Sequence, residues 1–401
     1  MTLPLIIYRS LRQHALSTVI TVGSIALACG LLMTVWMVKT QSQTAFTQTN
    51  AGFDAVLGAR GSKLQLVLNA IFHLEASAGN LAFADYEAIK RHPAVKAAIP
   101  IAVGDNLRGY RLVGTVPELF QTVEYAPGKK YVLMEGGKIF GADAKEAVAG
   151  SFAAQRLGLK VGDKFHPFHG LAYDAKNEHA DSYTLTAVLA PTNTPADRVV
   201  WIPLRGLQTM NGHDPKAATD LSAVLVQLRT PAAGFMLDMM YNKQGNRLTL
   251  AYPVGAIIAE LFSKISWFDQ VLALVAYLVA FVAAGSVLAS IYNSMNARRR
   301  DLAILRALGA RRRTIFGAVV AEAACIGALG AVVGYVVYFG LLVGVASVIR
   351  TQTGVAIDIT ARLPILWICP LVMIALCALG GVVPAFKAYR TPVAETLAPL
   401  S

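Results

Sequence analysis

The segment "DKFHPFHGLAYDAKNEHADSY" contains the residue types that could bind a transition metal. His166, His169 and His179 are three of only seven histidines in the chain, and aspartates lie close to them in the same segment. Imidazole and carboxylate groups together suit zinc or copper. The segment therefore predicts either a metal site formed by His166, His169 and His179 or a polar loop whose histidines are simply solvated.

Catalytic chemistry is not indicated elsewhere. The run G-x-x-x-x-G-K-[ST], which cradles nucleotide phosphates on backbone N–H groups, does not occur in the sequence. Acidic side chains are too scattered to suggest a hydrolase. We therefore expect no catalytic residue and no directly bound cofactor, with zinc as the one ion to consider.

A basic segment, "MNARRRDLAILRALGARRRT" at 295–314, contains seven arginines. Leu302, Leu305 and Leu308 recur at every third residue, which predicts an amphipathic helix, and Gly309 supplies a helix stop. One interpretation is a loop that sets membrane topology and contacts lipid headgroups. The other is a docking helix whose apolar stripe enters a groove on a cytoplasmic protein.

The composition of the chain is that of a membrane protein, so membrane-spanning helices are expected to position these segments. Of 401 residues, 55% are hydrophobic and 15% are charged, which is low for a soluble domain. Four apolar runs are long enough to cross a bilayer. The sequence predicts spans at 17–38, within 253–295, at 314–349 and at 363–386.

The net charge of +12 is concentrated beside these spans. Arginines and lysines near the N-terminus, in the basic segment and after the fourth span place these parts in the cytoplasm by the positive-inside rule. We therefore expect both termini inside a bacterial inner membrane, with 39–252 outside. Nucleic acid is not an expected partner, because the basic groups line a membrane edge.

Residues 39–252 have a different pattern, of short β-branched runs separated by Gly, Pro and Asn. The runs at 109–116, 182–204 and 221–229 predict strands, whereas 83–98 and 145–163 predict helices. We expect an α+β extracytoplasmic domain inserted between the first and second membrane helices.

From Pro253 onward the apolar stripe of a helix continues without a breaker into the second span. This predicts one long helix over about 254–295 that serves as stalk and membrane helix. The third apolar run also exceeds the bilayer thickness. Two projecting apolar stripes need a partner, and a second copy of the chain is the simplest one.

The predicted order along the chain comprises nine segments. They are a cytoplasmic interfacial helix at 1–16, a membrane helix at 17–38, the extracytoplasmic domain at 39–252, the stalk and second membrane helix at 253–295, a cytoplasmic helix at 296–313, the third membrane helix at 314–349, a short loop at 350–362, the fourth membrane helix at 363–386 and a tail at 387–401.

Within the third span, Glu322 is the only charged side chain. An ionisable group in a membrane normally faces the bundle interior, so an interhelical hydrogen bond or a proton relay is expected there. Gly330 and Gly334, followed by Gly340 and Gly344, are spaced for close helix packing.

The stretch from Arg298 to Ala310 resembles the cytoplasmic loop of FtsX-like, MacB-type permeases of ABC transporters, which has the form R-R-x-[DE]-[IL]-x-[IL]-L-R-[AS]-[LIV]-G-A. The segments "RSLRQHALSTVITVGSIALACGLL", "AEAACIGALGAVVGYVVYFG" and "PAFKAYRTPVAETLAPL" are similar to the same family. The order of four spans with a large domain after the first agrees with it.

This resemblance implies a non-catalytic permease subunit that works with a separate cytoplasmic ABC ATPase, which binds ATP and Mg. The residues expected to couple to that ATPase are Arg299, Asp301, Leu302, Leu305, Arg306, Leu308 and Gly309. The family transmits ATPase closure to its outer domain, in export, efflux or lipoprotein release, and the resemblance adds a periplasmic or outer-membrane protein to the candidate partners. The permease would pair with a second copy or a related chain. A membrane-anchored ligand or metal sensor without an ATPase is the alternative.

Overall fold

The structure, a computed structural model, describes residues 8–9, 11–13, 15–48, 51–213, 219–297 and 310–390. The chain divides into two compact units. We call residues 1–41, 266–347 and 358–401 the helical unit, and residues 42–265 and 348–357 the α/β unit. Each unit is described by itself.

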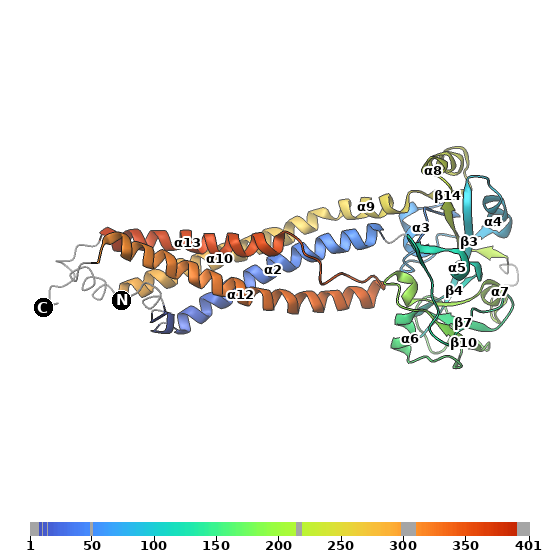
Figure 1. Ribbon diagram of the computed structural model, residues 1–401. Coiled ribbons are helices and arrows are strands. Elements are labelled where there is room, and N and C mark those ends of the chain that lie inside the picture. The colour runs from blue at the N-terminus through green and yellow to red at the C-terminus, as the bar shows by residue number, and fades with distance from the viewer. Residues whose placement is uncertain are drawn as a thin grey trace. The chain divides into compact units, whose positions relative to one another are not determined.

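In the part of the chain that the structure describes, the helical unit contains four long helices (Figure 1). They are α2 (Ala15–Gln48), α10 (Ser266–Ala297), α12 (Arg312–Thr353) and α13 (Ile365–Arg390). Each is long and apolar enough to cross a membrane. The predicted four-helix membrane fold with an inserted mixed α/β domain is confirmed.

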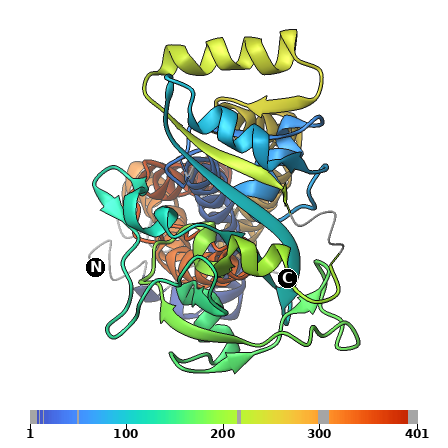
Figure 2. The ribbon, with the colours of Figure 1, turned by 90° about the vertical axis from the view of Figure 1, so that its right-hand side faces the viewer.

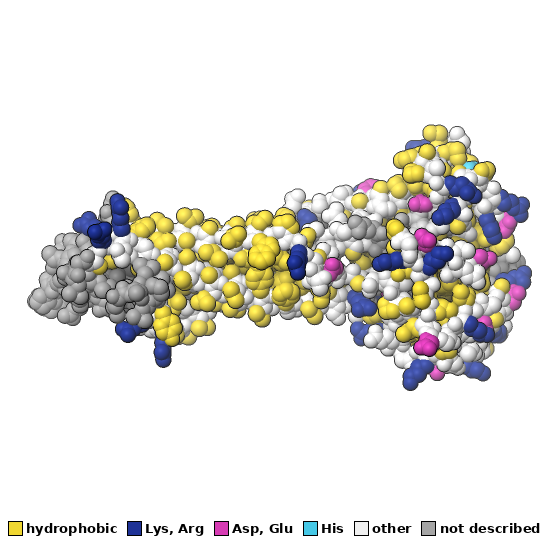
Figure 3. Space-filling model, in the orientation of Figure 1, with side chains coloured by type: hydrophobic (Ala, Val, Ile, Leu, Met, Phe, Trp, Pro, Cys, Tyr) yellow, Lys and Arg dark blue, Asp and Glu magenta, His cyan; other side chains and the backbone are white. Residues whose placement is uncertain are grey.

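Apolar side chains fill the interior of the helical unit. On α2, Ile25, Cys29, Met33 and Met37 are fully buried and recur every fourth residue, so they form one face of the helix. Many large hydrophobic side chains are exposed on the outward faces of the helices, and hydrophobic side chains cover much of the face shown in Figure 3. Water would disfavour such a surface, whereas lipid chains accept it.

The α/β unit is organised around one ten-stranded sheet. Its path is β14–β1–β13–β3–β4–β11–β7–β10–β8, and β9 pairs with β3. The pairs β4/β11 and β7/β10 are parallel, and the others are antiparallel. The strands are β1 (Ala55–Ala59), β3 (Val95–Leu107), β4 (Tyr110–Thr115), β7 (Glu146–Ala149), β8 (Lys164–Phe165), β9 (Phe168–His169), β10 (Tyr183–Val188), β11 (Val200–Pro203), β13 (Ala223–Leu228) and β14 (Leu248–Ala251).

Two short antiparallel pairs lie outside this sheet, namely β2 (Leu81–Ala82) with β12 (Asp220–Leu221) and β5 (Glu124–Ala126) with β6 (Lys129–Lys130). Helices accompany the strands. They are α3 (Lys63–Ala70), α4 (Phe83–Lys90), α5 (Glu118–Thr122), α6 (Ser151–Leu157), α7 (Leu204–Gln208), α8 (Pro231–Asp238) and α9 (Val254–Lys264), with short helical turns η1 (Pro195–Arg198) and η3 (Met239–Gln244).

The large sheet is buried on both faces. Along β13, Val224 and Val226 belong to one hydrophobic cluster, whereas Ala223 and Leu225 belong to another. This alternation follows from the two-residue period of a strand. Side chains of α4, α6, α7 and α8 pack into the first cluster, and side chains of α3, α5 and α9 pack into the second. The result is a three-layer arrangement with two cores.

Two of the helices predicted from sequence are shorter than expected. The run 83–98 begins as α4, but from Val95 onward it is β3. The run 145–163 contains α6, but it begins as β7. Both corrections concern alanine- and valine-rich residues that occupy the buried sheet, where tertiary packing outweighs local helix propensity. Gly158 ends α6 with φ +69°, a left-handed conformation that favours glycine.

The predicted continuous helix over 254–295 is also interrupted. Ile265 separates α9 from α10, and its backbone N–H donates to the carbonyls of Leu261 and Ser263. Its φ of −95° and ψ of 3° are not those of an α-helix. The stalk and the membrane helix are therefore two helices.

The 13-residue strand β3 runs across the α/β unit (Figure 2). Its first part pairs with β13, and its last part pairs with β4 and β9. The register against β4 shifts between Val103 and Asp105, which marks a β-bulge. A bulge locally changes the direction of side chains, and Asp105 follows directly after it.

Candidate functional site

The residues predicted to couple to an ATPase lie outside the described residues. This applies to Arg299, Asp301, Leu302, Leu305, Arg306, Leu308 and Gly309. Their role stays a prediction that rests on the sequence.

The residues predicted for helix packing lie on α12. A Cβ added at Gly330 would stand 2.5 Å from Cγ2 of Ile25, and one at Gly334 would stand 3.1 Å from Cβ of Cys29. Both glycines therefore allow α12 to approach α2 closely. Glu322 is half-buried on the same helix.

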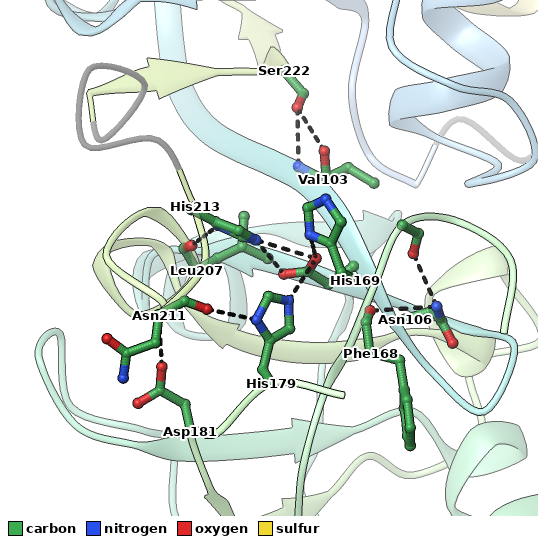
Figure 4. A network of polar contacts seen from close by, with 12 residues as sticks. Val103, Asn106, Phe168, His169, His179, Asp181, Leu207, Asn211, His213 and Ser222 are labelled. Carbon is green, nitrogen blue, oxygen red and sulfur yellow. Dashed lines mark hydrogen bonds and ion pairs between the residues drawn. The ribbon is translucent and has the colours of Figure 1, made fainter. Parts of the chain in front are cut away.

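Four polar side chains converge in the α/β unit, and we call them the histidine cluster: Asp105, His169, His179 and His213. Nδ1 of His169 and Nε2 of His179 each lie 3.3 Å from Oδ1 of Asp105. Nε2 of His213 lies 3.3 Å from Oδ1 and 3.2 Å from Oδ2 of the same carboxylate. In Figure 4 the three imidazole rings point toward one another.

Backbone carbonyls orient two of these rings. Nδ1 of His179 lies 2.7 Å from the carbonyl oxygen of Asn211, and Nδ1 of His213 lies 2.9 Å from that of Leu207. A carbonyl can only accept, so in both rings Nδ1 carries the proton. Nε2 is therefore the atom that each of these histidines offers to the centre of the cluster.

Burial differs sharply within the histidine cluster. The side chain of Asp105 is fully buried and that of His179 is 5% exposed, whereas His169 is 58% exposed. The hydrogen bond to Asp105 is the main reason why the pKa of His213 is raised above its usual range. The histidine cluster thus has Asp105 and His179 in the interior and His169 at the solvent-exposed side.

The chain holds the His169 loop in place through Asn106, which is fully buried beside Asp105. Its side-chain amide donates to the carbonyl oxygens of Gly170 and Ala172 at 2.9 and 3.0 Å, and its Oδ1 accepts from Gly109 N–H at 2.9 Å. These bonds fix the backbone that follows β9.

The turn that carries His213 depends on Gly212. This residue has φ +98°, a conformation that favours glycine, and a Cβ there would contact Nδ1 of His179 at 3.5 Å. The preceding backbone N–H of Asn211 donates to Asp181 Oδ2 at 2.7 Å. Asp181 also pairs with Lys145, so the turn is fixed from both sides.

A cavity of about 940 Å³ opens beside this turn. Its wall includes Lys145, Asp181 and Asn211 together with residues of α7. Because the Asn211 carbonyl accepts from His179, the cavity wall and the histidine cluster share one hydrogen-bonded turn.

The structure joins only part of the predicted histidine set. His169 and His179 belong to the cluster, but the described structure places Nδ1 of His166 3.3 Å from the carbonyl oxygen of His179, outside the cluster. Sequence reasoning missed Asp105 and His213, which are 108 residues apart. The only local signal at His213 is its place in an Asn-Gly turn, which carries no chemical information.

Comparison with known family models identifies the class of protein. The FtsX-like permease C-terminal model matches residues 273–393, and the MacB-like periplasmic core domain model matches residues 18–234. Among solved structures, the periplasmic region of MacB from Actinobacillus actinomycetemcomitans is 11% identical with a TM-score of 0.35, covering 53% of this chain and 94% of that chain.

A second solved structure is the extracellular domain of the noncanonic ABC-type transporter YknZ from Gram-positive bacteria. It is 15% identical with a TM-score of 0.30, covering 49% of this chain and 97% of that chain. The comparison with curated proteins found no match.

The two family models together span both units. The chain therefore belongs to the FtsX-like permeases that have a MacB-like periplasmic core domain. It is a multi-pass membrane protein and a permease subunit of an ABC transporter.

Proposed function

We propose that this permease couples ATP hydrolysis by a separate cytoplasmic ATPase to a conformational change of its α/β unit, in export, efflux or lipoprotein release. The observation that carries this proposal is the continuity of two helices. α2 and α12 each contribute residues to both units without a break in the helix. A continuous helix can pass a displacement along its axis, because its backbone hydrogen bonds link every turn to the next.

The ATPase would bind the segment 298–310. Its leucines at every third residue form an apolar stripe that suits a groove on a partner. The ATP and Mg would be held by that partner, since the sequence has no phosphate-binding loop of its own. The arginines and lysines beside the spans support a topology with both termini in the cytoplasm of a bacterial cell and the α/β unit outside the inner membrane.

A second copy of the permease is the proposed partner within the membrane. Gly340 and Gly344 lie on an exposed face of α12, and a Cβ added at either would meet no described atom within 4 Å. Glycines four residues apart allow two membrane helices to pack closely. By contrast, α2 already packs against Gly330 and Gly334.

Purification of the tagged chain from its native host in mild detergent tests the proposal. A P-loop ATPase should co-purify in stoichiometric amount with the wild type. Leu305→Asp should reduce its recovery at least about 10-fold, because a buried charge in an apolar groove is costly. The variant should still reach the membrane.

Ala303→Asp is the matched control. It introduces the same charge two residues earlier, on the opposite side of the predicted helix, and should retain the ATPase. Full retention by Leu305→Asp would contradict the proposed docking. Absence of any ATPase from the intact wild type would favour a membrane-anchored sensor.

A further inference from the structure

We propose that Asp105, His169, His179 and His213 form a binding site for a divalent transition-metal ion, with Zn²⁺ as the reference ion. The inference is independent of the ATPase, because all four ligands lie in the α/β unit of this chain.

The distances within the histidine cluster fit a shared metal ion. Three imidazole nitrogens approach the Asp105 carboxylate at 3.2–3.3 Å, and the four ligand atoms lie within 4.8 Å of one another. Direct N–H···O bonds are usually shorter, near 2.9 Å. Two tetrahedral ligands at the Zn–N and Zn–O distances of 2.0–2.1 Å stand about 3.3 Å apart. The three distances from the carboxylate to the imidazole nitrogens therefore match those between ligands of one metal ion.

Protonation supports the same conclusion. In His179 and His213 the backbone carbonyls fix the proton on Nδ1. When such a ring is neutral, its Nε2 lone pair is available to a metal ion that the carboxylate of Asp105 also binds. Metal-ligating histidines commonly bond their second nitrogen to a backbone carbonyl in this way.

Charge also favours a cation. Asp105 is fully buried, and within the part of the chain that the structure describes its only ion-pair partners are the three histidines. A buried carboxylate without a lysine or arginine is costly. A divalent ion bound to this carboxylate and three neutral imidazoles would leave a net charge of only +1.

The donor set selects the class of ion. Three imidazole nitrogens and one carboxylate suit Zn²⁺ and its first-row neighbours, whereas Mg²⁺ and Ca²⁺ prefer oxygen ligands. His169 is the most exposed ligand and lies on the short strand β9. The ion therefore enters and leaves on the His169 side, which makes the site exchangeable.

Titration of the purified full-length chain in detergent tests the site. After treatment with chelator, Zn²⁺ is added against a competing chromophoric chelator, and Co²⁺ is added separately for its absorption spectrum. We expect one Zn²⁺ per chain with submicromolar affinity, and an intense tetrahedral Co²⁺ band. Loss of an outer hydrogen bond around a metal costs 10–100-fold in affinity, so loss of a ligand in His169→Ala should cost at least about 100-fold.

His166→Ala is the matched control, because His166 is an exposed histidine near the cluster that contributes no ligand. It should keep the wild-type affinity within about 3-fold, well below the cost of losing even an outer-shell partner. His213→Gln provides a second ligand variant should His169→Ala fail to fold, which gel filtration reports. Zn²⁺ binding weaker than 0.1 mM in the wild type, or equal losses in His166→Ala and His169→Ala, would overturn the proposal.

Discussion

The helical unit and the α/β unit differ in where buried polar side chains find their hydrogen-bond partners. In the helical unit, Thr21 and Thr34 donate to backbone carbonyls one turn earlier, Ser17 and Gly30, so their polarity is satisfied locally. In the α/β unit, buried Asp105 and Asp181 meet partners from distant segments. The difference shows that apolar contacts between helices and with lipid determine the structure of the helical unit. The α/β unit, in contrast, can bring polar side chains from distant segments together in one site.

Buried Asp197 shows how the α/β unit satisfies a charge. Its carboxylate accepts from the backbone N–H groups of Thr192 and Asn193 and from the Thr192 hydroxyl at 2.8–3.0 Å. Several donors compensate the lost hydration of a buried carboxylate. Asp105 differs from Asp197 because its oxygens face only imidazole nitrogens among the described side chains.

The largest expected effect is a loss of stability in acid that is confined to the α/β unit. Burial, reinforced by Arg111 and Arg198, lowers the pKa of His73 in the α/β unit to about 3 from the usual 6.5. Below pH 6.5 the folded state therefore binds fewer protons than the unfolded state. The free energy of unfolding that depends on neutral His73 is fully present above pH 6.5 and is lost as the pH falls from 6.5 toward 3. The loss is about 1.4 kcal/mol per pH unit, or roughly 4 kcal/mol at pH 3.5.

Denaturant unfolding followed by tryptophan fluorescence measures this dependence, because Trp201 packs edge-on against His73. In His73→Gln the free energy of unfolding should be lower at pH 7 but much less dependent on pH. Equal slopes in the wild type and the variant would show that His73 is not the group responsible.

An intermediate effect is expected in the helical unit, where a steric change should matter and pH should not. Gly330→Leu places a side chain where a Cβ alone would stand 2.5 Å from Ile25. Overpacking of this kind costs about 3 kcal/mol at the upper end of its usual range. Thermal unfolding in detergent should show the loss.

Gly285→Leu is the control for that change, because a Cβ at Gly285 on α10 would meet no described atom within 4 Å. Its melting temperature should stay near that of the wild type. Similar losses in both variants would indicate a general effect of bulk on membrane helices rather than the contact between α2 and α12.

The smallest expected effect concerns the loop that carries His169. Asn106→Ala removes the donor to Gly170 and Ala172 and leaves their carbonyls without it. The free energy of unfolding of the α/β unit should fall by about 2 kcal/mol. If the histidine cluster binds zinc, the affinity should also fall about 10-fold, since the loop orients a ligand.

Asn80→Ala serves as the comparison, because its exposed amide makes a 3.3 Å bond to Asp220 at the surface. It should change neither quantity measurably. A full loss of zinc binding in Asn106→Ala without a loss of stability would assign Asn106 a more direct part in the site.

The membrane helices could be predicted from sequence because hydropathy is a local property that needs only a run of about 20 residues. The strand runs at 109–116 and 221–229 were predictable for the same reason, since β-branched residues recur there. Residues 95–98 and 146–149 were not, because short alanine- and valine-rich runs fit a helix or a buried strand equally well. Only the pairing of distant strands decides between the two.

The histidine cluster illustrates the same limit at a site. His169 and His179 are close in sequence and could be proposed together. His166 is even closer to His169, yet its ring contacts a backbone carbonyl instead. Asp105 reaches the cluster because of the bulge in β3, and His213 reaches it because of the turn at Gly212. The register of a sheet and the position of such a turn cannot be deduced from one sequence.

The strand β3 has a thermodynamic consequence of its own. Its residues pair with β13 over one part of the sheet and with β4 over the other, and its side chains enter both hydrophobic clusters. Neither half of the sheet can lose this strand and remain intact. Heating should therefore melt the two halves in one cooperative calorimetric transition, with a van't Hoff enthalpy equal to the measured enthalpy of the α/β unit.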